Sequence, residues 1–136
     1  MRISAIDTAA EILSGIRLNR ISEKDVKSAL LKDYLALRKV AKDAEQQKVA
    51  LIDKFREDWK DELPIIKAFR DHNKPVVGHL DYLEAERDVN EAVKRIYEAD
   101  AEIDLSPVKV ADMMDFSEDV TLEQVAFLVE AGVLEE

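Results

Sequence analysis

The feature that most constrains the fold is a stretch of 40 residues, Glu23 to Glu62, with neither glycine nor proline. Apolar side chains recur along it at intervals of three, four or seven residues: Val26, Leu30, Tyr34, Leu37, Ala41, Ala44, Leu51, Phe55 and Trp59. This spacing places them along one side of an α-helix. The sequence therefore predicts one nearly continuous helix over residues 23–60, about 57 Å long at about 1.5 Å per residue.

A helix of that length exceeds the diameter of a compact globule of 136 residues, which is roughly 35–40 Å. We therefore expect residues 1–136 to form a single elongated helical domain. The apolar series has a weak place, because Lys48 stands between Ala44 and Leu51 and residues 43–48 are almost wholly polar. Two interpretations stay open. The first is a solvated stretch of a long helix, and the second is a bend, or a site where another helix approaches closely over Ala41 and Ala44.

The rest of the chain predicts an all-α fold, since three glycines and three prolines are too few for an all-β protein rich in tight turns. We expect helices over residues 3–18, from 79 or 80 to 99, over 107–116 and over 121–131, with a short helical piece at 65–71. The 79–99 helix is the natural antiparallel companion of the long helix. The last helices would form a small C-terminal cap, opened by a capping box at Thr121 and Gln124 and closed by Gly132.

Two short segments have the character of strands. Val76 and Val77 are β-branched, and Glu102–Leu105 alternates polar and apolar residues, as half-buried strands do. They flank the 79–99 helix, so we expect them to meet as a minimal two-stranded β ribbon.

Charge divides the chain unequally. Residues 1–60 hold 13 bases and 10 acids, a net charge of +3, whereas residues 61–136 hold 7 bases and 20 acids, a net charge of −13. The near-neutral first half and the acidic second half can attract each other within one chain. Equally, they can attract a second copy or a basic partner.

Composition excludes several classes of function. The absence of cysteine removes thiolate catalysis, disulfides and cysteine-ligated zinc. The three glycines lie 63 and 54 residues apart, so no phosphate-binding glycine loop is present. No apolar stretch is long enough to span a membrane, and early charges at Asp7 and Glu11 argue against a signal peptide. We expect a cytoplasmic protein that binds neither membranes nor, being acidic, nucleic acid.

Three acidic or histidine clusters are candidate metal sites. Asp100, Glu102 and Asp104 begin like a calcium loop, but Leu105 and Ala111 stand where that loop needs a glycine and a glutamate. A second cluster is Asp58, Asp61 and Glu62, and a third pairs His72 and His79 with nearby aspartates. Clustered surface acids and histidines at helix ends are more often solvated, so we expect no metal, no cofactor and no enzymatic activity.

The remaining class is an interaction protein. We expect a protein–protein interaction or assembly module that self-associates, at least as a dimer, through the long helix. The candidate interaction residues are Leu37, Ala41, Ala44, Leu51, Phe55 and Trp59. The alternative is an acidic regulatory protein that imitates nucleic acid toward a basic partner.

The order of segments resembles small uncharacterised helical proteins of phages and prophages. The resemblance rests on a short N-terminal helix, a long charged helix, the turn at Lys74–Val77, the segment Glu102–Val108 and the closing segment Leu122–Leu128. It covers most of the chain and implies no catalytic residues. It implies a protein of the host cytosol that acts in particle assembly, or in regulation by contact.

Overall fold

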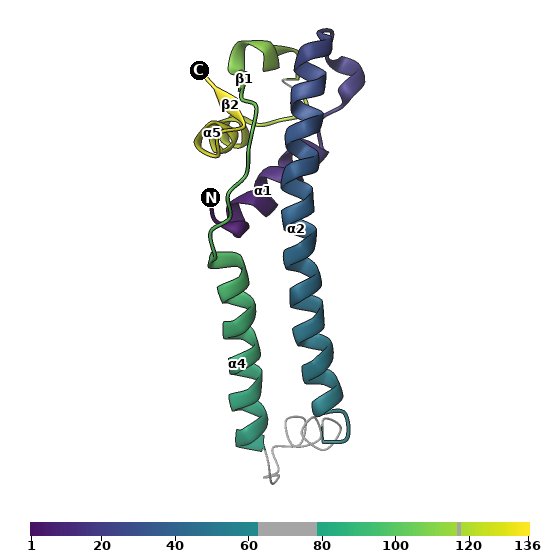
Figure 1. The fold of residues 1–136 in the computed structure, drawn as a ribbon, viewed down its shortest axis with the longest axis vertical. Coiled ribbons are helices and arrows are strands. Elements are labelled where there is room, and N and C mark those ends of the chain that lie inside the picture. Colours follow the sequence, from purple (N-terminus) through teal and green to yellow (C-terminus); the bar gives the residue numbers. More distant parts are fainter. Residues whose placement is uncertain (63–78, 117) are drawn as a thin grey trace. The chain divides into compact units, whose positions relative to one another are not determined.

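The computed structural model describes residues 1–62, 79–116 and 118–136 (Figure 1). The fold is mainly α-helical, which confirms the predicted fold class. The elements are α1 (Ile3–Ser14), the 3-10 helix η1 (Leu18–Arg20), α2 (Lys24–Asp58), α4 (His79–Glu98), β1 (Val108–Lys109), the 3-10 helix η2 (Val110–Phe116), α5 (Leu122–Glu130) and β2 (Leu134–Glu135).

The predicted long helix is confirmed. Helix α2 runs for 35 residues without interruption, and so passes through the polar stretch 43–48 as a regular helix. Residues 45–47 are exposed, as the solvated interpretation expects, whereas Ala41 and Ala44 are buried, as a close approach of another segment over these small residues would produce.

The chain divides into two compact units. We call residues 1–44 and 98–136 the core unit, and residues 45–97 the helix-pair unit. The division does not follow the change in charge at residue 60. Helix α2 contributes its first part to the core unit and its last part to the helix-pair unit.

The core unit encloses one apolar core. Its most deeply buried side chains come from α1, the first part of α2, η2, α5 and the two strands; they include Ile6, Ala9, Leu30, Leu37, Met113, Leu128, Val133 and Leu134. The N-terminus is fixed to this unit by backbone pairing, because the Ile3 N–H donates to the Ala99 carbonyl at 2.9 Å and the Ala101 N–H donates to that of Met1 at 2.9 Å.

In the helix-pair unit, α4 runs antiparallel to the last part of α2, as the sequence predicts (Figure 1). The aromatic ring of Tyr82 contacts the rings of Phe55 and Trp59, with 5.5 Å between ring centroids in each case. The Trp59 ring meets Tyr82 edge to face, a favourable arrangement for aromatic pairs. Tyr82 is buried, while Phe55 and Trp59 are half-buried.

The β ribbon forms between strands other than those predicted. Strand β1 pairs in parallel with β2, with Val108 opposite Leu134. Residues Glu102–Leu105 form no strand, and residues 74–78 lie outside the described part of the chain. The alternation at 102–105 reflects a segment that is half-buried along the core unit without a strand partner among the described residues.

Two helix boundaries also differ from the prediction. Helix α1 ends at Ser14 instead of residue 18, because Gly15 follows and the chain turns into η1. The predicted 107–116 helix begins only at Val110 and is a 3-10 helix, because residues 108 and 109 are engaged in the sheet.

Both predicted ends of α5 are confirmed. The Gln124 N–H donates to the Thr121 hydroxyl at 3.2 Å, and the Thr121 N–H donates to Gln124 Oε1 at 2.9 Å. At the other end Gly132 has φ of +82°. The Val133 N–H then donates to the Leu128 carbonyl at 3.0 Å and the Gly132 N–H to that of Val129 at 3.1 Å, which is a Schellman motif. This turn directs Val133 and Leu134 into the core.

Candidate interaction surface

The structure places the six predicted interaction residues in two settings. Leu37, Ala41 and Ala44 are buried within the single chain. Leu51, Phe55 and Trp59 are half-buried. The first three therefore contribute to folding of one copy, and a partner reaches them only by displacing what covers them.

The two aromatic residues find a partner inside their own unit. Phe55 and Trp59 are the two aromatic residues among the predicted interaction residues. Tyr82 supplies a neighbour to both rings. Sequence reasoning did not pair these rings because they are more than 20 residues apart in the chain.

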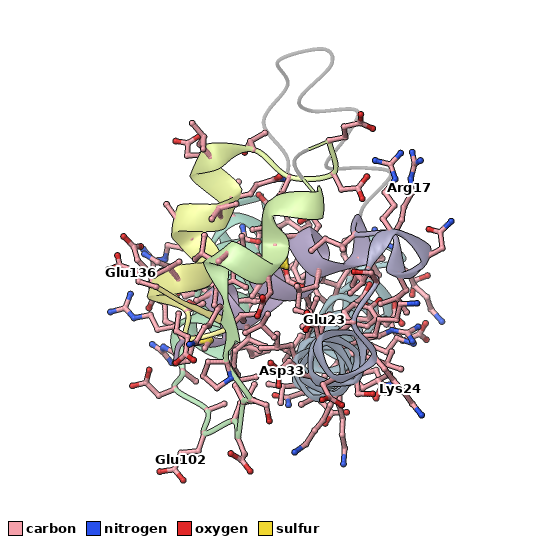
Figure 2. The ribbon with its side chains drawn as sticks, turned by 90° about the horizontal axis from the view of Figure 1, so that it is seen from above. Arg17, Glu23, Lys24, Asp33, Glu102 and Glu136 are labelled. Atoms are coloured by element: carbon pink, nitrogen blue, oxygen red, sulfur yellow. The ribbon has the colours of Figure 1, made fainter. Side chains whose placement is uncertain are left out.

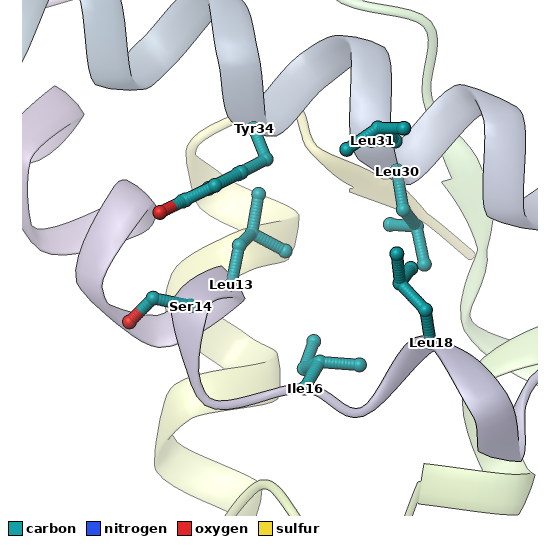
Figure 3. A pocket seen from close by; sticks show the side chains of 7 residues that line it. All are labelled: Leu13, Ser14, Ile16, Leu18, Leu30, Leu31 and Tyr34. Carbon is teal, nitrogen blue, oxygen red and sulfur yellow. The ribbon is translucent and has the colours of Figure 1, made fainter.

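A half-open apolar crevice lies in the core unit (Figure 3). Helix α1 supplies Leu13 and Ser14, α2 supplies Leu30, Leu31 and Tyr34, and the connection between these helices supplies Ile16 and Leu18. The cavity has a volume of about 150 Å³. Apart from the Ser14 and Tyr34 hydroxyls, its lining is apolar, formed by aliphatic side chains and the Tyr34 ring, so the crevice suits an apolar group.

Exposed leucines surround this crevice. Leu18 is 41% exposed and Leu31 is 43% exposed, and both line it; Leu35, one turn along α2 from Leu31, is 52% exposed. Apolar side chains that gather at one place on a surface mark an interaction site. This cluster lies outside the apolar series that the sequence highlighted.

The side of α2 that carries these leucines is otherwise basic. Six basic or leucine residues of this helix follow one another at intervals of three or four residues and so share one side of it. We call this side the basic-leucine face; its residues are Lys24, Lys27, Leu31, Leu35, Arg38 and Lys42. The aspartates of the same stretch project from other sides of the helix, since they fall outside this spacing. The sequence interleaves acids and bases here, but the helix separates them.

Several charged residues of the core unit lie on opposite sides of it. Figure 2 shows Arg17 and Lys24 on one side of the unit and Glu102 and Glu136 on the other. Basic and acidic groups also meet within the unit, because the Arg20 guanidinium lies 2.7 Å from the Glu118 carboxylate and the Arg17 N–H donates to Asp119 Oδ2 at 3.3 Å. The hydrogen bond with Glu118 raises the pKa of Arg20. Part of the charge asymmetry is therefore balanced within the chain.

A buried carboxylate, Asp33, is the one charged side chain in the described core that the sequence interpretation missed. Its Oδ1 accepts the Ser106 N–H at 2.8 Å, and its Oδ2 has no hydrogen-bond partner among the residues that the structure describes. Burial raises the pKa of Asp33; the Ser106 hydrogen bond and nearby Lys32 lower it, and Asp104 raises it. A signal was present in the sequence, because Asp33 stands three residues after Leu30 and four before Leu37, on the buried side of α2.

The candidate metal sites are not assembled in the part of the chain that the structure describes. There, no group of three or more histidine, aspartate or glutamate side chains is placed to hold an ion. This includes the clusters at Asp58 and at Asp100. His72 lies outside the described residues, and His79 begins α4.

Within the described ranges, none of the helices combines the length and the apolar character needed to cross a membrane. No protein-family model, no curated protein and no solved structure matches this chain.

Proposed function

We propose that this protein is a non-enzymatic protein–protein interaction or assembly module that self-associates. The observation that carries the proposal is the cluster of exposed leucines, Leu18, Leu31 and Leu35, around a half-open apolar crevice. Fully burying a leucine side chain is worth about 1.5–3 kcal/mol. Burial of three neighbouring leucines would therefore provide a strong driving force for association.

Charge favours a second copy as the partner. Leu31 and Leu35 lie on the basic-leucine face, and residues 118–136 of the same chain contain six acids and no base. Opposite charges on two surfaces of one molecule attract when copies meet head to tail. The proposal places self-association at the leucine cluster of the core unit rather than at the aromatic end of α2.

The resemblance to phage and prophage proteins adds a setting to this proposal. A module of this kind acts in the host cytoplasm, in particle assembly or in regulation by contact. The absence of a membrane-crossing helix among the described residues is compatible with that setting.

Sedimentation velocity over the low to high micromolar range tests self-association. We expect the wild-type sedimentation coefficient to rise with concentration. The Leu31→Glu variant places a charge at the crevice, and we expect it to remain monomeric. Val49→Glu is the matched control, since Val49 lies on the same helix, is 47% exposed and does not line the crevice.

Two other outcomes would contradict this proposal. A wild-type protein that stays monomeric throughout would refute self-association. Dissociation by Trp59→Ala, with Leu31→Glu without effect, would move the interface to the aromatic end of α2.

The alternative is an acidic protein that imitates nucleic acid toward a basic partner. It is supported by exposed acids such as Glu123, Glu130 and Glu136, which belong to a segment, residues 118–136, that contains no base. Mimicry depends on charge and is weakened by salt, whereas burial of leucines is not. A salt titration of binding to a basic probe such as polylysine, compared with a salt titration of self-association, separates the two functions.

A further inference from the structure

Leu122 is the most exposed large apolar side chain in the described part of the chain. It is 91% exposed, whereas Leu35, the next, is 52% exposed. Leu122 is the first residue of α5, and the capping box of Thr121 and Gln124 fixes the backbone on both sides of it. It is therefore a leucine held at a defined position in water, where it contributes little to the stability of a single copy.

The crevice in the same unit has the size and chemistry to take such a side chain. An apolar cavity of about 150 Å³ can hold a benzene molecule with its six carbon atoms, and a leucine side chain has four carbons. The crevice lining is apolar except for two hydroxyls. Leu122 does not fill the crevice of its own chain, because a side chain so exposed contacts almost nothing.

The surroundings of the two features carry opposite charge. Beside Leu122 the exposed acids are Glu123 and Glu118, of which Glu118 already pairs with Arg20 of its own chain, and the segment 118–136 has no base. The crevice adjoins the basic-leucine face, which carries Lys24, Lys27, Arg38 and Lys42 and no acid. Acidic groups around an apolar side chain thus match basic groups around an apolar crevice.

We propose that Leu122 of one copy inserts into the crevice lined by Leu13, Leu30 and Leu31 of a second copy. This inference rests on the proposed self-association and identifies the residue that the second copy contributes. Each copy then offers two different surfaces, a projecting leucine and a crevice. Such a contact either closes into a ring or continues as an open chain.

The test compares two variants with complementary defects. Leu122→Ala lacks the projecting side chain and keeps the crevice, while Leu31→Glu blocks the crevice and keeps Leu122. We expect each substitution alone to weaken self-association by about tenfold or more, since each removes most of one buried leucine. An equimolar mixture should associate more strongly than either variant alone, because Leu122 of one fits the intact crevice of the other.

Two controls test whether the effect of Leu122→Ala is specific to the contact and does not arise from a loss of stability. Thermal unfolding of Leu122→Ala should match that of the wild type, because the side chain is in solvent and alanine is a good helix former. Leu83→Ala, which shortens another exposed leucine, should leave association unchanged.

The outcomes separate this inference from the function on which it rests. If the wild type associates and Leu122→Ala associates equally well, the Leu122 contact is refuted while self-association stands. If the equimolar mixture associates no better than its components, the pairing of Leu122 with the crevice is likewise refuted. If the wild type never associates, both proposals fail together.

Discussion

The two parts of α2 continue one series of apolar residues, but the side chains of the first part are buried more deeply than those of the second. In the core unit, residues 24–44 bury Val26, Leu30, Leu37, Ala41 and Ala44. In the helix-pair unit, the series continues through Lys48, Leu51 and Phe55, which are only half-buried. Spacing therefore indicates which side of a helix turns inward. The depth of burial depends on how many other elements cover that side.

The largest expected difference between the two parts concerns leucine truncation. Leu37→Ala should lower the free energy of unfolding by about 2–5 kcal/mol, because it leaves a cavity in a closely packed core. Leu51→Ala should cost about 1 kcal/mol, since Leu51 is already partly in water. Urea unfolding followed by circular dichroism measures both. Equal losses would show that the apolar side of α2 is covered equally along its length.

A smaller effect separates two substitutions at Asp33, the buried acid of the first part of α2. Asp33→Asn keeps an oxygen that accepts the Ser106 N–H, whereas Asp33→Ala leaves that N–H without its partner. We expect the alanine variant to be less stable than the asparagine variant by about 1–3 kcal/mol. Because neither variant carries a charge at this position, urea unfolding of the pair isolates the hydrogen bond. Equal stability would mean that water replaces the carboxylate.

The same residue predicts a pH dependence. Because burial raises the pKa of Asp33, the folded state binds this proton more tightly than the unfolded chain does. The stabilisation of the folded state by this bound proton is complete below about pH 4. It decreases as the pH rises through the raised pKa of Asp33.

The wild type should therefore lose stability relative to Asp33→Asn as the pH rises from about 4 toward neutrality. Parallel profiles for wild type and Asp33→Asn would contradict a raised pKa.

The smallest effect concerns two glycines of the core unit. Gly132→Ala should cost about 1 kcal/mol, because Gly132 has φ of +82° and alanine is strained there. Gly15→Ala should cost nothing or stabilise slightly, since Gly15 has φ of −84° and an added Cβ would meet only the Ile12 carbonyl at 3.5 Å. Thermal unfolding of the pair gives the comparison. A loss at Gly15 as large as that at Gly132 would show that space, not backbone conformation, limits both positions.

Local signals in the sequence predicted several elements well. The long helix, its companion α4, the capping box at Thr121 and the left-handed Gly132 all depend on residues close together in the chain. Pairing of β1 with β2 was missed, because it joins segments about 25 residues apart through a turn whose direction Gly132 sets. The alternation at Glu102–Leu105 was misleading, since half-burial of an extended segment produces it without a strand partner.

The candidate interaction residues show the same limit. Leu37, Ala41 and Ala44 were chosen because the sequence does not reveal what covers them, and the structure buries them within one chain. Leu31 and Leu35 were passed over because they lie off the main apolar series, and their exposure emerges only once the core is assembled. Leu122 is an apolar residue at the start of a helix, and its sequence context does not distinguish it from a buried leucine.

The sequence by itself determined the helices, their caps and the separation of charge, because these depend on backbone preferences and on spacing within one turn of helix. Which apolar side chains remain in water and where a crevice opens depend on the tertiary structure. Burial is a property of the segments that pack around a residue, and those segments are distant in the chain. The exposed leucines therefore became visible only when the elements were placed together, whereas the position of Asp33 on the buried side of α2 follows from spacing within the helix.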